Sequence, residues 1–246
     1  MELLAIDQGN TTTKFGYFRA GRLQHNWSVA TDRGATAEML GQILQEEGIV
    51  APLALGLSTV TLELLPAWRR MAQDSGYSLT VVNGNTPAPL QNQYGTPETL
   101  GADRFMAAVA AADLVGTPVI VISLGTAIVV DAVSLGSAYL GGIIAPGITA
   151  TTVALENSAS ALPLGHWAPP SRAIARGTAE ALANGLFYQS VGGLRAMVQA
   201  VRDELAISAP LALHGGWAHQ LAPHLDGVAL VDEHLVLRGI YLTLNQ

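Results

Sequence analysis

The sequence predicts an α/β fold made of two related halves. Short apolar segments of strand length alternate with longer segments in which apolar residues recur at helical spacing. An apolar strand followed by a polar residue, a spacer, a glycine and a hydroxyl or amide residue occurs at 3–11 and again at 119–126. Because this pattern returns about half a chain later, we expect two domains of related fold, at 1–115 and 116–246.

The first half begins with a β-hairpin, because the apolar runs at 3–6 and 15–18 flank a tight Gly-Asn turn. The elements expected next are strands at 22–29, 53–58 and 79–82, helices at 35–46 and 62–73, and an alanine-rich helix at 105–114. Pro66 marks the first turn of the second of these helices. Residues 84–100 have little periodicity and predict a long loop, and loops of this length often carry function.

The second half opens with strands at 119–122 and 128–131, which are separated by a turn at 123–127. The later elements are a strand from Tyr139 to a Gly/Pro turn at 145–147, a helix at 148–156, an irregular stretch at 157–171, a helical region at 172–203, strands at 211–213 and 228–231, and a helix at 233–244. Several glycines weaken the helical region at 172–203.

Composition excludes several classes of function. The 246 residues carry a formal net charge of −7, so no basic surface for nucleic acid is expected. The absence of cysteine excludes disulfides and thiol chemistry. No apolar run approaches the ~18 residues of a membrane span, and the N-terminus lacks the pattern of a secretory signal. We therefore expect a cytoplasmic protein without nucleic-acid or membrane partners, and the low charge favours a homo-oligomer interface.

The turn of the first hairpin carries the most concentrated chemistry in the chain. It offers a carboxylate, backbone N–H groups, three hydroxyls and an amine, from Asp7, Gln8, Gly9, Asn10, Thr11, Thr12, Thr13 and Lys14. These groups suit a phosphate chain and its Mg²⁺. Lys14 is the only lysine in the sequence. Taken alone, the segment fits a plain hairpin turn with a solvated lysine about as well as a phosphate site.

Further motifs follow this turn in a fixed order. They are Leu100-Gly-Ala-Asp-Arg104, Gly125-Thr-Ala127 with Asp131, Gly141-Gly-Ile-Ile-Ala-Pro-Gly147, Thr178, Gly215-Gly216 and Leu235-Val-Leu-Arg-Gly239. Together with the hairpin turn, these motifs make the chain resemble the type III pantothenate kinases, a family of the actin-like and sugar-kinase-like ATPase superfamily. The resemblance covers almost the whole chain.

The resemblance implies two RNase-H-like domains with a central nucleotide cleft and an intertwined homodimer. It implies ATP-dependent phosphorylation of pantothenate to 4′-phosphopantothenate, the first step toward coenzyme A. It also implies a need for Mg²⁺ and for a monovalent cation, K⁺ or NH₄⁺.

Roles for individual residues follow from the resemblance. It implies that Asp7 to Lys14, with Gly125 and Thr126, bind ATP, and that Asp7 meets the Mg²⁺ that accompanies ATP. Pantothenate contacts are implied for Tyr94, Gly101, Ala102, Asp103, Arg104 and Thr178. Asp103 is the expected base that accepts the proton of the substrate hydroxyl, although Asp is also common in the first turn of a helix. A planar guanidinium at Arg104 suits the carboxylate of pantothenate.

One position departs from the family pattern. Family members usually carry an aspartate where this chain has Ser123, and that aspartate binds the monovalent cation. A serine hydroxyl attracts a cation far less strongly than a carboxylate. Because Asp103 and Asp131 are present, we expect retained activity with an altered cation requirement.

Two other functions compete with a pantothenate kinase. The first is a kinase for another small alcohol or a sugar, which would differ in the substrate pocket around Tyr94, Arg104 and Thr178. The second is a catalytically impaired or regulatory relative, and Ser123 is the sequence feature that favours it.

Overall fold

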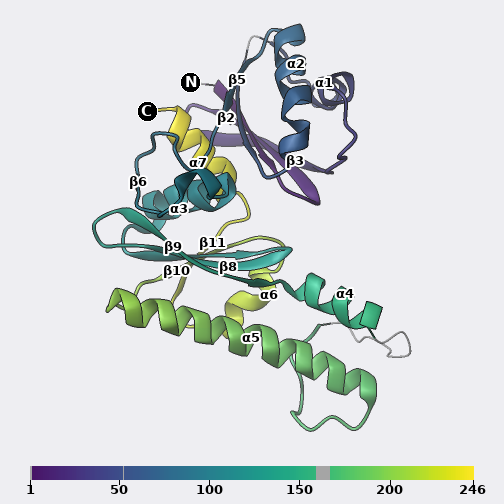
Figure 1. Ribbon diagram of the computed structural model, residues 1–246, viewed down its shortest axis with the longest axis vertical. Helices are drawn as coiled ribbons and strands as arrows, with labels where there is room; N and C mark the ends of the chain where they lie inside the picture. The colour runs from purple at the N-terminus through teal and green to yellow at the C-terminus, as the bar shows by residue number, and fades with distance from the viewer. Residues whose placement is uncertain (1, 52, 159–166) are drawn as a thin grey trace. The chain divides into compact units, whose positions relative to one another are not determined.

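The computed structural model describes residues 2–51, 53–158 and 167–246, which divide into two compact units (Figure 1). Unit 1 combines the chain up to Leu114 with His234–Gln246, and unit 2 comprises Val115–Glu233. The predicted boundary near residue 115 is close to the first break between the units. Residues 234–246, expected in the second half, pack instead within unit 1.

Unit 1 is built on a five-stranded sheet in the order β3-β2-β1-β4-β5. The strands are β1 (Glu2–Gln8), β2 (Thr12–Arg19), β3 (Arg22–Ala30), β4 (Ala54–Thr59) and β5 (Ser78–Val81). The hairpin strands β1, β2 and β3 are antiparallel, whereas β4 pairs parallel with β1 and β5 pairs parallel with β4. The two parallel connections each contain a helix, as the predicted strand–helix alternation requires.

Helices cover both faces of this sheet. On one face, α1 (Ala37–Glu46) and α2 (Leu65–Ser75) bury Leu40, Leu44 and Trp68 against Leu4 and Ile6 of β1. As predicted, the proline of α2 lies in its first turn.

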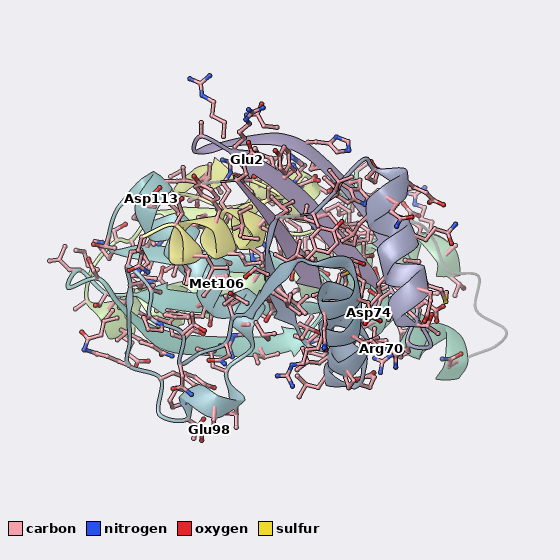
Figure 2. All side chains as sticks on the ribbon, turned by 90° about the horizontal axis from the view of Figure 1, so that it is seen from above. Glu2, Arg70, Asp74, Glu98, Met106 and Asp113 are labelled. Carbon is pink, nitrogen blue, oxygen red and sulfur yellow. The ribbon has the colours of Figure 1, made fainter. Side chains whose placement is uncertain are left out.

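The other face is covered by α7 (Leu235–Leu244), which approaches the sheet closely because Gly56 of β4 has no side chain. A Cβ at Gly56 would lie 2.5 Å from Ile240 of α7. Helix α7 also packs on α3 (Ala102–Val115), the helix that carries Met106 (Figure 2). Gly239 of α7 lies against the backbone of Met106. These glycines explain how a chain segment from the far end of the sequence completes unit 1.

Unit 2 repeats the topology of unit 1. Its strands are β7 (Val119–Leu124), β8 (Ala127–Val133), β9 (Ala138–Pro146), β10 (Leu211–His214) and β11 (Val228–Val231). Their order is β11-β10-β7-β8-β9, with β7, β8 and β9 antiparallel and with β10 parallel to both β7 and β11. Strand by strand, β7 to β11 correspond to β1 to β5. The predicted repeat is therefore confirmed at the level of topology.

The long helix α5 (Thr178–Leu205) covers one face of the unit 2 sheet (Figure 1). Leu194 and Val198 of this helix are buried against Ile122 and Leu211. Helix α5 begins six residues later than the helical region expected at 172–203, and it is continuous through its glycines. A side chain at those glycines would face open space. The glycines therefore lower the helix propensity of the segment, but no packing contact depends on them.

Shorter elements complete the two units. These are the helices α4 (Ile148–Ser158) and α6 (Ala218–Leu221), the short strand β6 (Gln91–Asn92), and the 3₁₀ turns at Leu62–Leu64, Pro97–Thr99 and Ala222–His224. Within the described parts of the chain, no helix combines the length and the apolar character that a membrane span requires.

Candidate active site

The turn between β1 and β2 is closed by a hydrogen bond from the backbone N–H of Gly9 to the carbonyl of Thr12, at 3.0 Å. The tip of the turn, at Asn10 and Thr11, is exposed. Among the described residues, the backbone N–H groups of Asn10 and Thr11 donate to no protein acceptor. The tip therefore carries backbone donors that an anion can take up.

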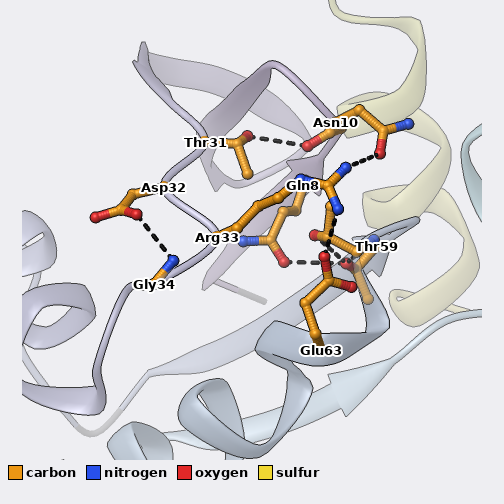
Figure 3. A network of polar contacts seen from close by, with 10 residues as sticks. Gln8, Asn10, Thr31, Asp32, Arg33, Gly34, Thr59 and Glu63 are labelled. Atoms are coloured by element: carbon orange, nitrogen blue, oxygen red, sulfur yellow. Dashed lines mark hydrogen bonds and ion pairs between the residues drawn. The ribbon is translucent and has the colours of Figure 1, made fainter.

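Buried polar contacts hold this turn from one side of the sheet. Gln8 is buried, and its Oε1 accepts a hydrogen bond from the hydroxyl of Thr59 at 3.0 Å (Figure 3). The same oxygen accepts the indole N–H of Trp68 at 3.2 Å. The side chain of Gln8 is thus used inside unit 1, and its backbone carbonyl accepts the N–H of Val60 at 3.1 Å, so Gln8 serves to hold the turn in place.

The segment after β3 holds the same turn from outside. The Thr31 hydroxyl donates to the carbonyl of Gly9 at 2.9 Å, and the Thr31 N–H donates to the carbonyl of Thr11 at 2.9 Å. The hydroxyls of Thr13 and Thr31 are 2.9 Å apart. Because the one proton of the Thr31 hydroxyl goes to Gly9, the Thr13 hydroxyl is the donor in that pair. The turn is therefore fixed before any ligand arrives.

Asp7 lies on the opposite face of the sheet from Gln8, because successive side chains of a strand alternate. Its register partners are Lys14 on β2 and Ser58 on β4. Side chains of register partners lie on one face, so the carboxylate of Asp7 is flanked by the amine of Lys14 and the hydroxyl of Ser58. Ser58 is fully buried, and its Oγ has no hydrogen-bond partner within the described residues.

Asp103 acts electrostatically on the Asp7 carboxylate of this face. Burial is the main cause that raises the pKa of Asp7 to about 7, and the neighbouring Asp103 carboxylate raises it further. Lys14 lowers the pKa of Asp7 but does not offset the other two. Two carboxylates that destabilise each other's charge in a desolvated place are a common sign of a functional site, and a divalent cation would relieve the repulsion.

The N-terminus of α3 positions Asp103. Asp103 lies in the first turn of this helix, where the helix dipole favours an anion. Its carboxylate folds back over Gly101, since a Cβ on that glycine would lie 2.5 Å from Oδ1 of Asp103. Ala102, between them, is buried, so its side chain serves packing. Gly101 therefore matters because it leaves room for the carboxylate.

Arg104 and Tyr94 are brought together from the helix and from the long loop before it. The guanidinium carbon of Arg104 lies 5.6 Å from the centroid of the Tyr94 ring, within the range of a cation–π contact. The backbone N–H of Tyr94 donates to Asn92 Oδ1 at 2.9 Å, and the Asn92 amide donates to the carbonyl of Gly84 at 2.6 Å. The predicted loop at 84–100 is thus internally braced around Tyr94.

In unit 2, the turn that corresponds to the β1–β2 turn is Gly125–Thr126. Gly147 packs directly on it, since a Cβ there would lie 2.4 Å from the carbonyl oxygen of Gly125 and 2.5 Å from that of Thr126. Gly215 has a φ of +95° and lies against the backbone of Leu124. Three glycine-containing turns therefore meet at one end of the unit 2 sheet.

The remaining candidates of unit 2 lie in different surroundings. Ser123 is a partly buried residue of β7 and the register partner of His214. Asp131 is buried in β8 and accepts a hydrogen bond from the Tyr139 hydroxyl at 3.0 Å. Thr178 is the exposed first residue of α5.

Sequence reasoning missed Thr31, Ser58, Thr59 and Trp68 as residues of the site. The pairing of β3 and β4 in the sheet brings Thr31, Ser58 and Thr59 to the turn, and the packing of α2 on the sheet brings Trp68 there. None of them carries a local motif. One sequence signal bears on these residues. Asp7 and Gln8 are adjacent in a strand, so the alternation of side chains places them on opposite faces of the sheet, each with its own neighbours.

Comparisons with known proteins show which family the chain resembles over nearly its whole length. The family model described as type III pantothenate kinase matches residues 3–200. A type III pantothenate kinase of Moorella thermoacetica is 32% identical over 250 residues, which cover 97% of this chain and 96% of the relative.

Solved structures show the fold. A conserved protein of Campylobacter jejuni assigned to the Baf family of transcriptional activators superposes with a TM-score of 0.66 at 19% identity, covering 98% of this chain and 97% of its own. An inorganic polyphosphate/ATP-glucomannokinase of Arthrobacter sp. strain KM gives a TM-score of 0.51 at 15% identity, covering 100% and 99%. The two-unit α/β architecture is thus that of the actin-like ATPases and sugar kinases. By the family match and the identity over nearly its whole length, the chain belongs to the type III pantothenate kinase family.

Proposed function

We propose that this protein transfers the γ-phosphoryl group of ATP to the primary hydroxyl of pantothenate. The product is 4′-phosphopantothenate, which feeds coenzyme A synthesis. The observation that carries the proposal is the electrostatic coupling of Asp103, at the start of α3, to Asp7, whose register partner on β2 is Lys14. Membership of the type III pantothenate kinase family supports the assignment of the substrate.

Asp103 is the proposed base. Its carboxylate accepts the proton of the pantothenate hydroxyl as that oxygen forms a bond to the γ-phosphorus and the bond from the γ-phosphorus to the bridging oxygen of ADP breaks. The helix N-terminus makes Asp103 a weak base. A largely dissociative transition state tolerates a weak base, because the carboxylate mainly orients the hydroxyl.

The phosphates of ATP are proposed to bind at the β1–β2 turn, where the N–H groups of Asn10 and Thr11 are available among the described residues. Thr12 and the amine of Lys14 add a hydroxyl and a positive charge, and Gly125–Thr126 is the corresponding turn of unit 2. Asp7 is the proposed carboxylate toward Mg²⁺, which when bound neutralises phosphate charge. The raised pKa of Asp7 supports this role, because a cation beside it would favour its ionised form.

For pantothenate, we propose that Arg104 binds the carboxylate. The cation–π contact with Tyr94 restrains the Arg104 side chain, and a guanidinium donates its hydrogen bonds in the fork geometry that a carboxylate accepts. Gly101 and Ala102 shape the backbone beside Asp103, and Thr178 is a further candidate contact in unit 2.

A coupled assay of ADP release tests the substrate. Purified protein is supplied with ATP, Mg²⁺ and either pantothenate or one of a panel of sugars and small alcohols. The proposal expects turnover with pantothenate alone. Turnover only with a sugar would contradict it, and ATP binding without turnover of any alcohol would favour a regulatory relative.

The monovalent cation requirement is proposed to be weakened, because Ser123 provides a hydroxyl where the resemblance implies a carboxylate. Rates in K⁺, NH₄⁺, Na⁺ and a bulky organic cation test this point. Strong activation by K⁺ over the organic cation would show that Ser123 supports a full cation site.

A homodimer working in the cytoplasm completes the proposal, since the family resemblance implies the dimer. Light scattering after size-exclusion chromatography distinguishes a monomer of 25.6 kDa from a dimer.

A further inference from the structure

Arg33 connects the tip of the β1–β2 turn with the segment after β4. Its Nη2 donates to Oδ1 of Asn10 at 2.8 Å, and its Nη1 donates to Oε1 of Glu63 at 2.7 Å (Figure 3). The loop that carries Arg33 is itself fixed, because Thr31 is bonded to the turn and Oδ1 of Asp32 accepts the N–H of Gly34 at 2.8 Å. The side chain of Arg33 therefore reaches the turn from a backbone segment that hydrogen bonds hold in place.

These contacts decide which way the Asn10 amide faces. A guanidinium has donors and no acceptor, so it is the oxygen of Asn10 that faces Arg33. The amide nitrogen then lies on the other edge of the planar group, and Figure 3 shows it directed away from Arg33. Among the described residues, this nitrogen donates to no protein acceptor. The tip of the turn therefore presents an oriented pair of N–H donors.

We propose that Arg33 is a positioning residue for nucleotide phosphates. By holding Oδ1 of Asn10, and being held itself by Glu63, it keeps the Asn10 amide in the orientation that donates to a phosphate oxygen of the bound nucleoside triphosphate. This inference rests on the proposed function, since it requires a nucleotide at the turn.

A plain surface ion pair would behave differently. The side chains of Arg33 and Glu63 are 59% and 47% exposed, and exposed pairs contribute little to stability. Removal of Arg33 should therefore leave the melting temperature nearly unchanged in either case. Only the positioning role predicts a loss of nucleotide affinity that depends on Asn10.

The test is a double-mutant cycle on Arg33 and Asn10, with a matched control. Arg33→Ala, Arg33→Lys, Asn10→Ala and the double variant Arg33→Ala/Asn10→Ala are compared with wild type. The control is Arg70→Ala, because Arg70 of α2 also forms an exposed ion pair in unit 1, with Asp74 at 3.3 Å (Figure 2). Calorimetry with a non-hydrolysable ATP analogue and with adenosine measures the Kd values, and steady-state rates give KM for ATP and for pantothenate.

We expect Arg33→Ala to raise the Kd of the ATP analogue about tenfold, about 1.4 kcal/mol. The KM for pantothenate and the Kd for adenosine should not change, and Arg33→Lys should recover part of the loss. In the Asn10→Ala background, Arg33→Ala should change the Kd by less than about twofold, because the two residues act as one unit.

Two outcomes would overturn the inference. In the first, Arg33→Ala binds the ATP analogue with the same Kd as Arg70→Ala. In the second, Arg33→Ala lowers the affinity for the analogue as much in the Asn10→Ala background as in wild type, which would make Arg33 a direct contact of the nucleotide. Failure of wild type to bind the ATP analogue would instead refute the proposed function along with this inference.

Discussion

Asp103 is the residue on which the proposed reaction depends most. Replacing it with Asn keeps the size and the polarity of the side chain but removes the proton acceptor. We expect kcat for pantothenate to fall by about 10²–10⁴-fold, the usual contribution of a general base, while the affinity for an ATP analogue is kept. Asp113→Asn is the control, because Asp113 is an exposed carboxylate on the same helix. Equal rates for the two variants would remove Asp103 from the reaction.

Asp7 gives the ligand-free protein a pH dependence of known sign. Its pKa is raised from 3.8 to about 7 in the folded state. Between these values the folded state holds a proton that the unfolded state has lost, so the free energy of unfolding falls as pH rises, and the loss is complete above about pH 7. Asp7→Asn should therefore gain melting temperature relative to wild type from pH 5 to pH 8. A difference that is constant over this range would contradict the shift.

The buried hydroxyl of Ser58 should have a measurable effect on stability. Its hydroxyl is buried without a partner among the described residues, and such a group costs about 1–3 kcal/mol. Ser58→Ala should raise the free energy of unfolding by about 1 kcal/mol in urea titrations. If activity falls in the same variant, the hydroxyl serves Asp7 in the reaction. A loss of stability would mean that Ser58 is bonded in solution.

At the scale of elements, the packing of α7 on α3 depends on Gly239. A Cβ at this position would lie 1.8 Å from the carbonyl oxygen of Met106. Gly239→Ala should therefore force the two helices apart and lower the free energy of unfolding by about 1–3 kcal/mol or more.

Gly41 of α1 provides the control for this substitution. A Cβ there would meet its nearest neighbour, Met71 Cγ, at 3.7 Å, which is ordinary contact. Gly41→Ala should stabilise the protein by about 0.5–1 kcal/mol, because alanine favours a helix. Equal effects of the two substitutions in urea titrations would contradict the close approach at Gly239.

The elements also show what a sequence can and cannot reveal. The hairpin at Asp7–Lys14 and the helix start at Asp103 were predictable, because strand alternation, turn residues and helix periodicity are local. The contacts of Thr31 and Arg33 with the turn were not, since they arise from the pairing of β3 with β2 across more than twenty residues of sequence. The orphaned hydroxyl of Ser58 likewise follows from tertiary packing alone.

At the scale of the molecule, α7 is required by unit 1. Leu235, Leu237 and Ile240 are at most 1% exposed, and each such side chain contributes roughly 1.5–3 kcal/mol when buried. Deletion of residues 234–246 should therefore remove hydrogen-exchange protection from β1 and β4, while β7 and β8 keep theirs. Deletion of the exposed residues 245–246 alone is the control. Unchanged protection of β1 in the longer deletion would contradict this division.

The sequence pattern could not predict that residues 234–246 belong to unit 1. The halves at 1–115 and 116–246 were inferred from a repeated motif, and a motif says where a unit begins but not which segment closes it. Only the contacts of Gly56 and Gly239 with their surroundings show that the last helix completes the first sheet.

The place of α7 sets an order of events during synthesis on the ribosome. All strands and helices of unit 2 leave the ribosome before Leu235–Leu244 does. Unit 2 can therefore reach its native packing while one face of the unit 1 sheet still waits for its covering helix. An apolar face that stays open for that time is a natural place for a chaperone to bind, and substitutions in α7 should lower the yield of folded protein in cells more than they lower the activity of molecules that have folded.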